Sequence, residues 1–286
     1  MRMNALLFMV VVAGGVWWSV LSFSEEQGLN VYVLSVGQGD AIYVRAPSGR
    51  DMLIDTGPSD RVVRELESVM PSADRSLDIL LLTHTDTDHV GGSAEVLSRL
   101  SVGMIIEGGG TASSSAYERY RQHAREQEIL RSIVHTGDII HLDDEVAFHV
   151  LLPRPEDVRA KTNGAKLGPN DIAVVGRLLH GTSSMLLTAD IERRGEVALA
   201  TSDADLSSDV LKVGHHGSRY SSWVQFLHRV QPQIAAISVG KNNYGHPSEF
   251  ALDRLKSEKS QILRTDTMGR IHFRSLGEGF VVVEGD

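Results

Sequence analysis

The chain has 286 residues, of which 42% are hydrophobic and 23% charged, and its formal net charge is −9. This is the composition of an ordinary globular protein with a substantial core, arranged as one large domain or two small ones. The acidic balance excludes a surface that attracts nucleic acid as a whole, so an anionic substrate would need local cations or metal ions. Because there is no cysteine, disulfides, thiolate ligands and a cysteine nucleophile are excluded, and metal ligands must be oxygen or nitrogen.

An uncharged, apolar run occupies residues 5–23, between Arg2 and the pair Glu25-Glu26. Its length is that of a membrane span and exceeds the ~7–15 apolar residues of a typical signal peptide. Trp17-Trp18 suit the outer membrane interface, and the positive end predicts an N-terminus inside with the rest of the chain translocated.

We therefore expect residues 1–24 to be a single-pass membrane anchor and residues 25–286 to form one extracytoplasmic domain. The alternative is a cleaved signal peptide, with Ser22 and Ser24 as small residues before the cleavage site. In that case the protein would be secreted.

Short strand-like runs alternate with helical patterns through the rest of the chain. The predicted strands are residues 30–36, 41–45, 52–55, 77–83, 146–152, 172–179, 185–188, 210–213, 234–239, 270–274 and 280–283. The predicted helices are residues 61–70, 93–100, 115–128, 193–200, 222–230 and 249–257. Residues 156–169 are rich in charge, glycine and proline and are predicted to be an exposed loop. A β-rich start, then βα units, then a second similar series predicts two sheets packed face to face with helices outside.

The stretch His84-Thr-Asp86-Thr-Asp88-His89 directly follows the apolar run at 77–83. Neutral imidazole and carboxylate are ligands for divalent first-row metals, and two of each at one turn let two ions share it. A plainer interpretation is helix capping, which Asp88 alone would satisfy. Capping gives no reason for His84, Asp86 and His89, so the stretch predicts a metal centre.

Three further strands end in candidate ligands, namely Asp190, the pair His215-His216, and His246. Asp190 serves equally well as the cap of the next helix, and the histidines are weak evidence alone. Strand ends on the same side of sheets converge on a crevice, where open α/β folds place ligands. The repeated arrangement therefore predicts one shared site. Asp55 also ends a strand, and we expect it to brace the metal loop rather than bind metal.

With these residues in place, the chain resembles the metallo-β-lactamase superfamily, whose signature is His-x-His-x-Asp-His after a strand. More narrowly it is similar to the soluble hydrolase domain of the ComEC DNA-uptake channels. The matching stretches are residues 36–41, 53–57, 83–92, 170, 186–190, 209–218, 237–240, 244–247 and 264–266. The resemblance covers about residues 29–284 and implies an αββα sandwich with a metal site at one edge.

Carried over by position, the resemblance implies two divalent metal ions, zinc or manganese. The implied ligands are His84 and Asp86 for the first ion, Asp88, His89 and His216 for the second, and Asp190 as the bridge. The resemblance leaves open which of His215 and His216 binds metal. The other histidine of the pair is expected nearby, where it could contact a metal ion or a phosphate. The implied catalytic residues are Asp88, Asp190, His215 and His246, the last as a substrate or general-acid residue.

Several departures from the family pattern bear on the site. Asp86 replaces the usual second histidine, which makes the site more oxygen-rich and favours manganese or iron alongside zinc. Asn170 stands where an additional histidine is expected, so the first site would be less completely filled. Ala189 replaces a frequent glycine. The many membrane helices of the uptake channel have no counterpart, so DNA translocation would need a channel partner.

The N-terminal apolar run and the resemblance together predict a membrane-anchored, extracytoplasmic phosphodiesterase, in particular a nuclease acting on DNA or another phosphodiester. Lys212, Arg219 and Lys241 are expected near the site, where they would offset the acidic surface, although ordinary solvated cations explain them equally well. One alternative is a hydrolase of a small phosphoester or lactone. Another is a non-catalytic member that binds DNA or a channel partner. The sequence gives no indication of oligomeric state.

Overall fold

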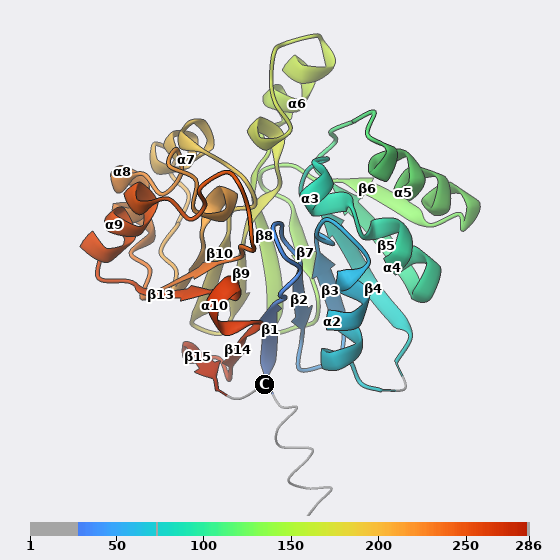
Figure 1. The fold of residues 1–286 in the computed structure, drawn as a ribbon, viewed down its shortest axis with the longest axis horizontal. Coiled ribbons are helices and arrows are strands. Elements are labelled where there is room, and N and C mark those ends of the chain that lie inside the picture. Colours follow the sequence, from blue (N-terminus) through green and yellow to red (C-terminus); the bar gives the residue numbers. More distant parts are fainter. Residues whose placement is uncertain (1–27, 73, 285–286) are drawn as a thin grey trace, which may run out of the picture.

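The computed structural model describes residues 28–72 and 74–284, which form two β-sheets packed face to face with helices on their outer faces (Figure 1). The predicted four-layer sandwich is thereby confirmed. Within the described part of the chain, no helix combines the length and apolar character needed to cross a membrane. The anchor predicted at residues 1–24 lies outside the described residues.

The first sheet has eight strands in the order β15-β14-β1-β2-β3-β4-β5-β6. Their bounds are β1 (Leu29–Val33), β2 (Ile42–Arg45), β3 (Asp51–Ile54), β4 (Ser76–Leu82), β5 (Ser101–Glu107), β6 (Leu130–Ile133), β14 (Ile271–Ser275) and β15 (Phe280–Val283). Strands β3 to β6 are parallel and the other neighbours are antiparallel. The helices on its outer face are α2 (Arg61–Val69), α4 (Ser93–Arg99) and α5 (Ser115–Glu126).

The second sheet has seven strands in the order β13-β12-β11-β10-β9-β8-β7. Their bounds are β7 (Ile139–His141), β8 (Val146–Leu152), β9 (Val175–His180), β10 (Ser183–Leu187), β11 (Val210–Lys212), β12 (Ile234–Ile237) and β13 (Gln261–Arg264). Strands β10 to β13 are parallel. The helices on its outer face are α7 (Arg193–Ala200), α8 (Val224–Val230) and α9 (Glu249–Ser257).

Strands β4 and β10 lie inside the sandwich and are covered on both faces. The last four residues of β4 and all five residues of β10 are buried. A strand covered on both faces reads as a continuous apolar run rather than as an alternating one. These two runs are therefore the clearest strand signals in the sequence.

The prediction of an exposed loop over residues 156–169 is wrong for its first half, because Pro155–Thr162 forms helix α6. Pro155 occupies the first helical turn, where its fixed φ suits a helix and its missing N–H costs nothing. Acidic residues in the first turn and basic ones in the last complement the helix dipole. The helix buries no residue and projects above the rest of the fold (Figure 1), so it lacks an apolar face to reveal it in the sequence.

Strands β5, β6 and β7 and the short helix α10 (Thr265–Met268) were not predicted. β6 and β7 are the edge strands of their sheets and have only four and three residues. Half-exposed strands this short carry little apolar periodicity. The absence of β6 and β7 from the prediction follows from their place at the edges of the sheets.

The parallel strands of both sheets end at one edge of the sandwich, as predicted. The loop after β4 contains the short helix α3 (Thr87–Val90), and the loops after β10, β11 and β12 come from the facing sheet. Because the sheets face each other, these loops meet across the end of the core. This convergence positions the site.

Candidate metal centre

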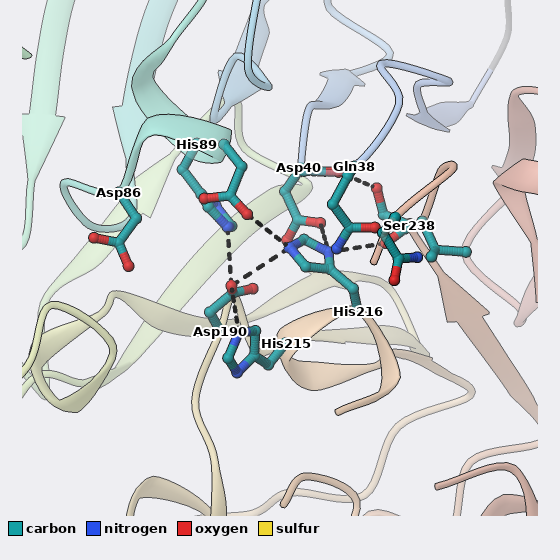
Figure 2. A network of polar contacts seen from close by, with 12 residues as sticks. Gln38, Asp40, Asp86, His89, Asp190, His215, His216 and Ser238 are labelled. Atoms are coloured by element: carbon teal, nitrogen blue, oxygen red, sulfur yellow. Dashed lines mark hydrogen bonds and ion pairs between the residues drawn. The ribbon is translucent and has the colours of Figure 1, made fainter. Parts of the chain in front are cut away.

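Asp190 lies at the centre of a cluster of imidazoles and carboxylates (Figure 2). Its Oδ2 is 3.2 Å from Nε2 of His89, 3.4 Å from Nε2 of His216 and 3.7 Å from Nε2 of His215. Oδ2 of Asp88 is 3.4 Å from Nε2 of His216. Asp88, His89, Asp190 and His216 offer ligand atoms that all lie within 4.8 Å of one another. The residues predicted for the second ion and the bridge are therefore brought together.

The rings of His89 and His216 are oriented by hydrogen bonds on their far sides. Nδ1 of His89 lies 2.7 Å from Oδ2 of Asp55, and Nδ1 of His216 lies 2.8 Å from the carbonyl oxygen of Ser238. A carbonyl or carboxylate oxygen accepts, so each ring carries a proton on Nδ1. In the neutral ring this leaves a lone pair on Nε2, facing Asp190.

Asp55 makes hydrogen bonds behind these candidate ligands, and its carboxylate also forms a second group of possible ligand atoms with His84 and His89. Its carboxylate accepts hydrogen bonds from the backbone N–H of Thr83 at 2.8 Å and from the Thr83 hydroxyl at 2.6 Å. Because the Thr83 hydroxyl donates its hydrogen bond to Asp55, its oxygen can accept a hydrogen bond from Nδ1 of His84, 3.0 Å away. The proton of the neutral His84 ring is thereby placed on Nδ1 as well, and its Nε2 is free to act as a ligand.

The donor set fits the divalent ions that the fold family implies. Several buried atoms of the cluster have no hydrogen-bond partner among the described residues. They are Nε2 of His84, His89 and His216 and Oδ1 of Asp190. Buried polar atoms are otherwise almost always paired. Nitrogen and oxygen atoms left unpaired and converging on one point are the expected arrangement of a metal site.

Burial and mutual charge shift the pKa values of the cluster in opposite directions. Burial and the neighbouring His89 lower the pKa of His84 to about 3. Burial opposes the protonation of His89 and His216, but the Asp190 carboxylate outweighs it and raises both pKa values well above the ordinary one. Burial likewise opposes ionisation of Asp190, yet these imidazoles hold its pKa well below its usual range. The site thus favours an ionised Asp190 carboxylate that is balanced by nearby positive charge. Divalent ions can supply that charge.

The capping interpretations considered from sequence are wrong. The cap of α7 is Glu192, and that helix begins at Arg193, beyond Asp190. The cap of α4 is Gly92, and Asp88 lies inside α3 rather than at a cap. Asp86 occupies the cap position of α3 but makes no side-chain capping bond. These carboxylates therefore have no capping role to explain them.

Asp40 and Lys212 form a buried ion pair behind His216, which sequence reasoning missed. Oδ1 of Asp40 is 3.3 Å from Nδ1 of His216 (Figure 2). Burial opposes ionisation of Asp40, but Lys212 and His216 lower its pKa strongly. The prediction that Lys212 offsets the surface charge for a substrate is wrong, because its side chain is wholly buried. Both residues lie in stretches that match the family, which was the available signal.

Gly39 lets the loop before Asp40 pack directly on the metal loop. It has a φ of +142°, and a Cβ there would collide with the carbonyl oxygen of Asp88. The same carbonyl accepts a hydrogen bond of 3.2 Å from the backbone N–H of Asp40. The Ser238 hydroxyl donates to the Gly39 carbonyl at 2.6 Å, which joins the loop to the facing sheet. The glycine is required by this close approach.

Asp86 lies on the open side of the centre, apart from the bonded network in Figure 2. Its side chain is 44% exposed, and its Oδ2 is 3.7 Å from Nε2 of His84. Asp86 and Asn170 line one cavity of about 430 Å³, together with Arg193, Arg194 and Tyr220. Oδ1 of Asn170 is buried without a hydrogen-bond partner. Asn170 therefore borders the site where the first ion was predicted.

His215 and His246 also lie on the open side. Nδ1 of His215 is 2.9 Å from Oε1 of Glu192, a residue the sequence did not single out. The hydrogen bond from His215 lowers the pKa of Glu192. The His246 ring centroid is 5.3 Å from that of His215. The structure thus places His246 beside the cluster, at its solvent side.

The backbone at the centre adopts a left-handed conformation at Ala189, His215 and His216, with φ values of 46°, 46° and 52°. Each such non-glycine residue costs about 1 kcal/mol. This explains why glycine suits position 189. The strain is local to the residues that present the ligands.

The chain belongs to the metallo-β-lactamase superfamily, whose family model matches residues 34–241. It is 33% identical over 292 residues to ComE operon protein 3 of Bacillus subtilis (strain 168), covering 94% of this chain and 36% of that protein. It is 32% identical over 278 residues to competence protein ComA of Neisseria gonorrhoeae, covering 95% of this chain and 36% of that protein. The chain therefore spans about a third of the length of these curated relatives.

Among solved structures, the fold matches the metallo-β-lactamase fold protein YhfI from Bacillus subtilis. The TM-score is 0.58 at 11% sequence identity, over 86% of this chain and 100% of that chain. This likeness supports the fold alone. Together with the family match, it makes the chain a metallo-β-lactamase-fold protein related to competence proteins, in a superfamily whose members are usually metal-dependent hydrolases.

Proposed function

We propose that the chain is a metal-dependent phosphodiesterase, in particular a nuclease that acts on DNA or another phosphodiester. The observation that carries this proposal is the set of buried Nε2 atoms of His84, His89 and His216 that make no hydrogen bond to a described residue, two of which face the Asp190 carboxylate. Such a set is suited to ions rather than to hydrogen bonding.

The donors suggest two divalent ions, zinc or manganese. His84 and Asp86 would serve the first ion, and Asp190 would bridge to the second. The ligands of the second are then Asp88, His89 and His216. Bound there, the ions supply activation of water and stabilisation of negative charge on a phosphate. Asp86 adds a carboxylate oxygen on the first side, which favours manganese or iron alongside zinc.

The open side would receive the substrate. Burial and the neighbouring His215 lower the pKa of His246, so its ring is neutral near pH 7. A neutral imidazole has one ring N–H to donate, and we assign it to the leaving-group oxygen. His215, held by Glu192, is placed to contact a metal or a phosphate oxygen.

Similarity to competence proteins supports nucleic acid as the substrate class. Residues 1–24 would tether the catalytic domain outside the cytoplasm, where a DNA-uptake channel is a fitting partner. Protease treatment of spheroplasts tests this topology. A domain protected from protease contradicts the orientation, and a mature chain without residues 1–24 contradicts the tether and indicates secretion.

The function is tested on the full chain, purified in detergent and loaded with manganese or zinc. Elemental analysis should find up to two ions per chain, and single- or double-stranded DNA or RNA should be cleaved. Asp253→Ala, an exposed carboxylate on α9, is the matched control for Asp88→Ala. Less than half an ion bound, unchanged in Asp88→Ala, contradicts the metal centre.

The substrates separate the remaining alternatives. Hydrolysis of a model phosphodiester, a small phosphoester or a lactone without cleavage of nucleic acid identifies a small-molecule hydrolase. Metal-loaded protein that binds DNA but turns over none of these substrates is a non-catalytic member of the family.

A further inference from the structure

The exposed aromatic side chains gather beside the metal centre. Among the described residues, Tyr220, Tyr244 and Phe250 are the aromatic side chains more than a third exposed, at 63%, 77% and 58%. Tyr220 follows the His215-His216 pair in the chain, and Tyr244 and Phe250 flank His246. Within residues 28–72 and 74–284, the exposed tyrosine and phenylalanine side chains are thus confined to the segments that carry these histidines.

This group is continuous with the open side of the centre. Tyr220 lines the same cavity as Asp86. The ring centroids of Tyr244 and His246 are 5.8 Å apart, and those of His246 and His215 are 5.3 Å apart. A strand with one phosphate at the metal centre would therefore pass over these rings.

Arg219 places a positive charge among the rings. Its guanidinium carbon lies 5.6 Å from the Tyr220 ring centroid and 4.9 Å from that of Phe250, both within range of a cation–π interaction. Arg219 is itself exposed, so its charge also reaches solvent. We call Arg219, Tyr220, Tyr244 and Phe250 the aromatic surface.

The backbone under the aromatic surface is fixed. The N–H of Ser248 donates to the Gly217 carbonyl at 2.9 Å, and a Cβ at Gly217 would collide with Pro247. Nη2 of Arg254 donates to the carbonyls of Arg219 and Ser221 at 2.8 and 2.7 Å. Hydrogen bonds therefore hold together the backbone segments that carry the rings, which favours stacking of a flat ligand on them.

We propose that the aromatic surface stacks unpaired nucleobases of the strand whose phosphodiester lies at the metal centre. This inference rests on the proposed function and adds the recognition of bases to it. Phe250 has no polar atom in its ring, so its exposure gains nothing from hydrogen bonding. Rings with an adjacent arginine suit stacked bases joined by phosphates, without preference for sequence. A duplex keeps its base faces internally stacked and would bind this surface more weakly.

The test measures binding of the full chain in detergent by fluorescence anisotropy, with EDTA present so that no metal-dependent cleavage occurs. The probes are oligothymidine, oligouridine, an abasic strand and a DNA duplex of equal length, about 12 nucleotides, within the range of known single-strand sites. Tyr220→Ala and Phe250→Ala should each weaken binding of the base-bearing strands about 5-fold or more and leave abasic binding unchanged.

Two controls sharpen the measurement. Phe250→Tyr keeps the ring and should bind like the wild type. Leu276→Ala removes a side chain of similar exposure, 70%, in the turn between β14 and β15, and should also leave binding unchanged.

Base-dependent binding of either the DNA or the RNA strand, lost in the two alanine variants, supports the inference. Equal losses on base-bearing and abasic strands, no loss in either variant, or equal binding of duplex would overturn it. Because binding is measured without metal, this result is independent of catalysis. A protein that cleaves no phosphodiester but shows base-dependent binding disproves the proposed function alone, and the reverse outcome disproves the aromatic surface alone.

Discussion

The two sides of the candidate metal centre are built differently. On the buried side, the side chains of His84, His89 and His216 are at most 1% exposed, and each ring has its Nδ1 held by a neighbour. On the open side, Asp86 is 44% exposed and His215 is 29% exposed. The buried side thus has its geometry set in advance, whereas the open side keeps room for a substrate. Changes on the buried side should reduce stability or metal affinity, and changes at the open rim should reduce rate.

Lys212→Met tests the buried support most severely. It leaves the Asp40 carboxylate buried without its ion-pair partner, which should lower the free energy of unfolding by about 3–5 kcal/mol. Chemical denaturation in EDTA measures this apart from metal binding. The double variant Asp40→Asn/Lys212→Met should lose less, because no charge remains unpaired. A double variant as unstable as the single one contradicts this explanation.

Glu196 tests whether the open side also has a rigid base. It is buried and accepts hydrogen bonds from the backbone N–H groups of Ser222 and Trp223, below the loop that carries Tyr220. Burial raises its pKa from 4.5 to about 7, against the effect of those N–H groups.

Between those two pH values, the folded state keeps a proton on Glu196 that the unfolded state releases. The stability contributed by this group is present below pH 4.5 and is lost as pH rises to about 7. Relative to Glu196→Gln, the free energy of unfolding should fall by up to about 3 kcal/mol over this range. Denaturation series at several pH values measure it, and a constant difference between the two proteins would rule it out.

Asp190→Ala removes the carboxylate at the centre of both sides. Metal content should fall, and the rate of phosphodiester hydrolysis should fall at least about 100-fold, or about 2.7 kcal/mol of barrier. Asp88→Ala should behave similarly, whereas Asp253→Ala should not. Rates measured at saturating manganese check this. Full activity in Asp190→Ala would show that this carboxylate is not needed for the reaction.

Asp55→Ala sharpens the contrast within the buried side, because Asp55 touches His89 but is not expected to bind an ion. Loss of the orienting hydrogen bond should weaken metal binding about 10- to 100-fold. Competition with a chelator measures the affinity. An unchanged affinity with a reduced rate would instead assign Asp55 to the reaction itself.

His246→Ala should have the smallest effect, about a 10-fold loss of rate with metal content retained, because one hydrogen bond to the leaving group is removed. His246→Asn, which keeps a donor, should recover part of the rate. Loss of metal in His246→Ala would instead group this residue with the metal-binding residues of the buried side.

The sequence indicates those parts of the fold and site that depend on local pattern. The β4 and β10 runs are apolar because both faces are covered, and the four candidate ligands from His84 to His89 lie within six residues of the chain. The Asp40–Lys212 pair has no such local signal, since it joins a loop of one sheet to a strand of the other. Helix α6 was missed for the opposite reason, because a helix that buries nothing has no periodic apolar face.

Strand β1 pairs on one side with β14, from Leu29 opposite Ser275 to Val33 opposite Ile271. The first described strand of the chain is thus completed by one of the last, and His272 Nε2 meets Asn30 Oδ1 at 2.9 Å across this junction. During synthesis, one edge of β1 stays unpaired until β14 has emerged. Contacts so distant in sequence form slowly and leave aggregation-prone intermediates. A premature stop before Ile271 would therefore leave every candidate metal ligand in place and still yield a nascent chain that cannot close its first sheet.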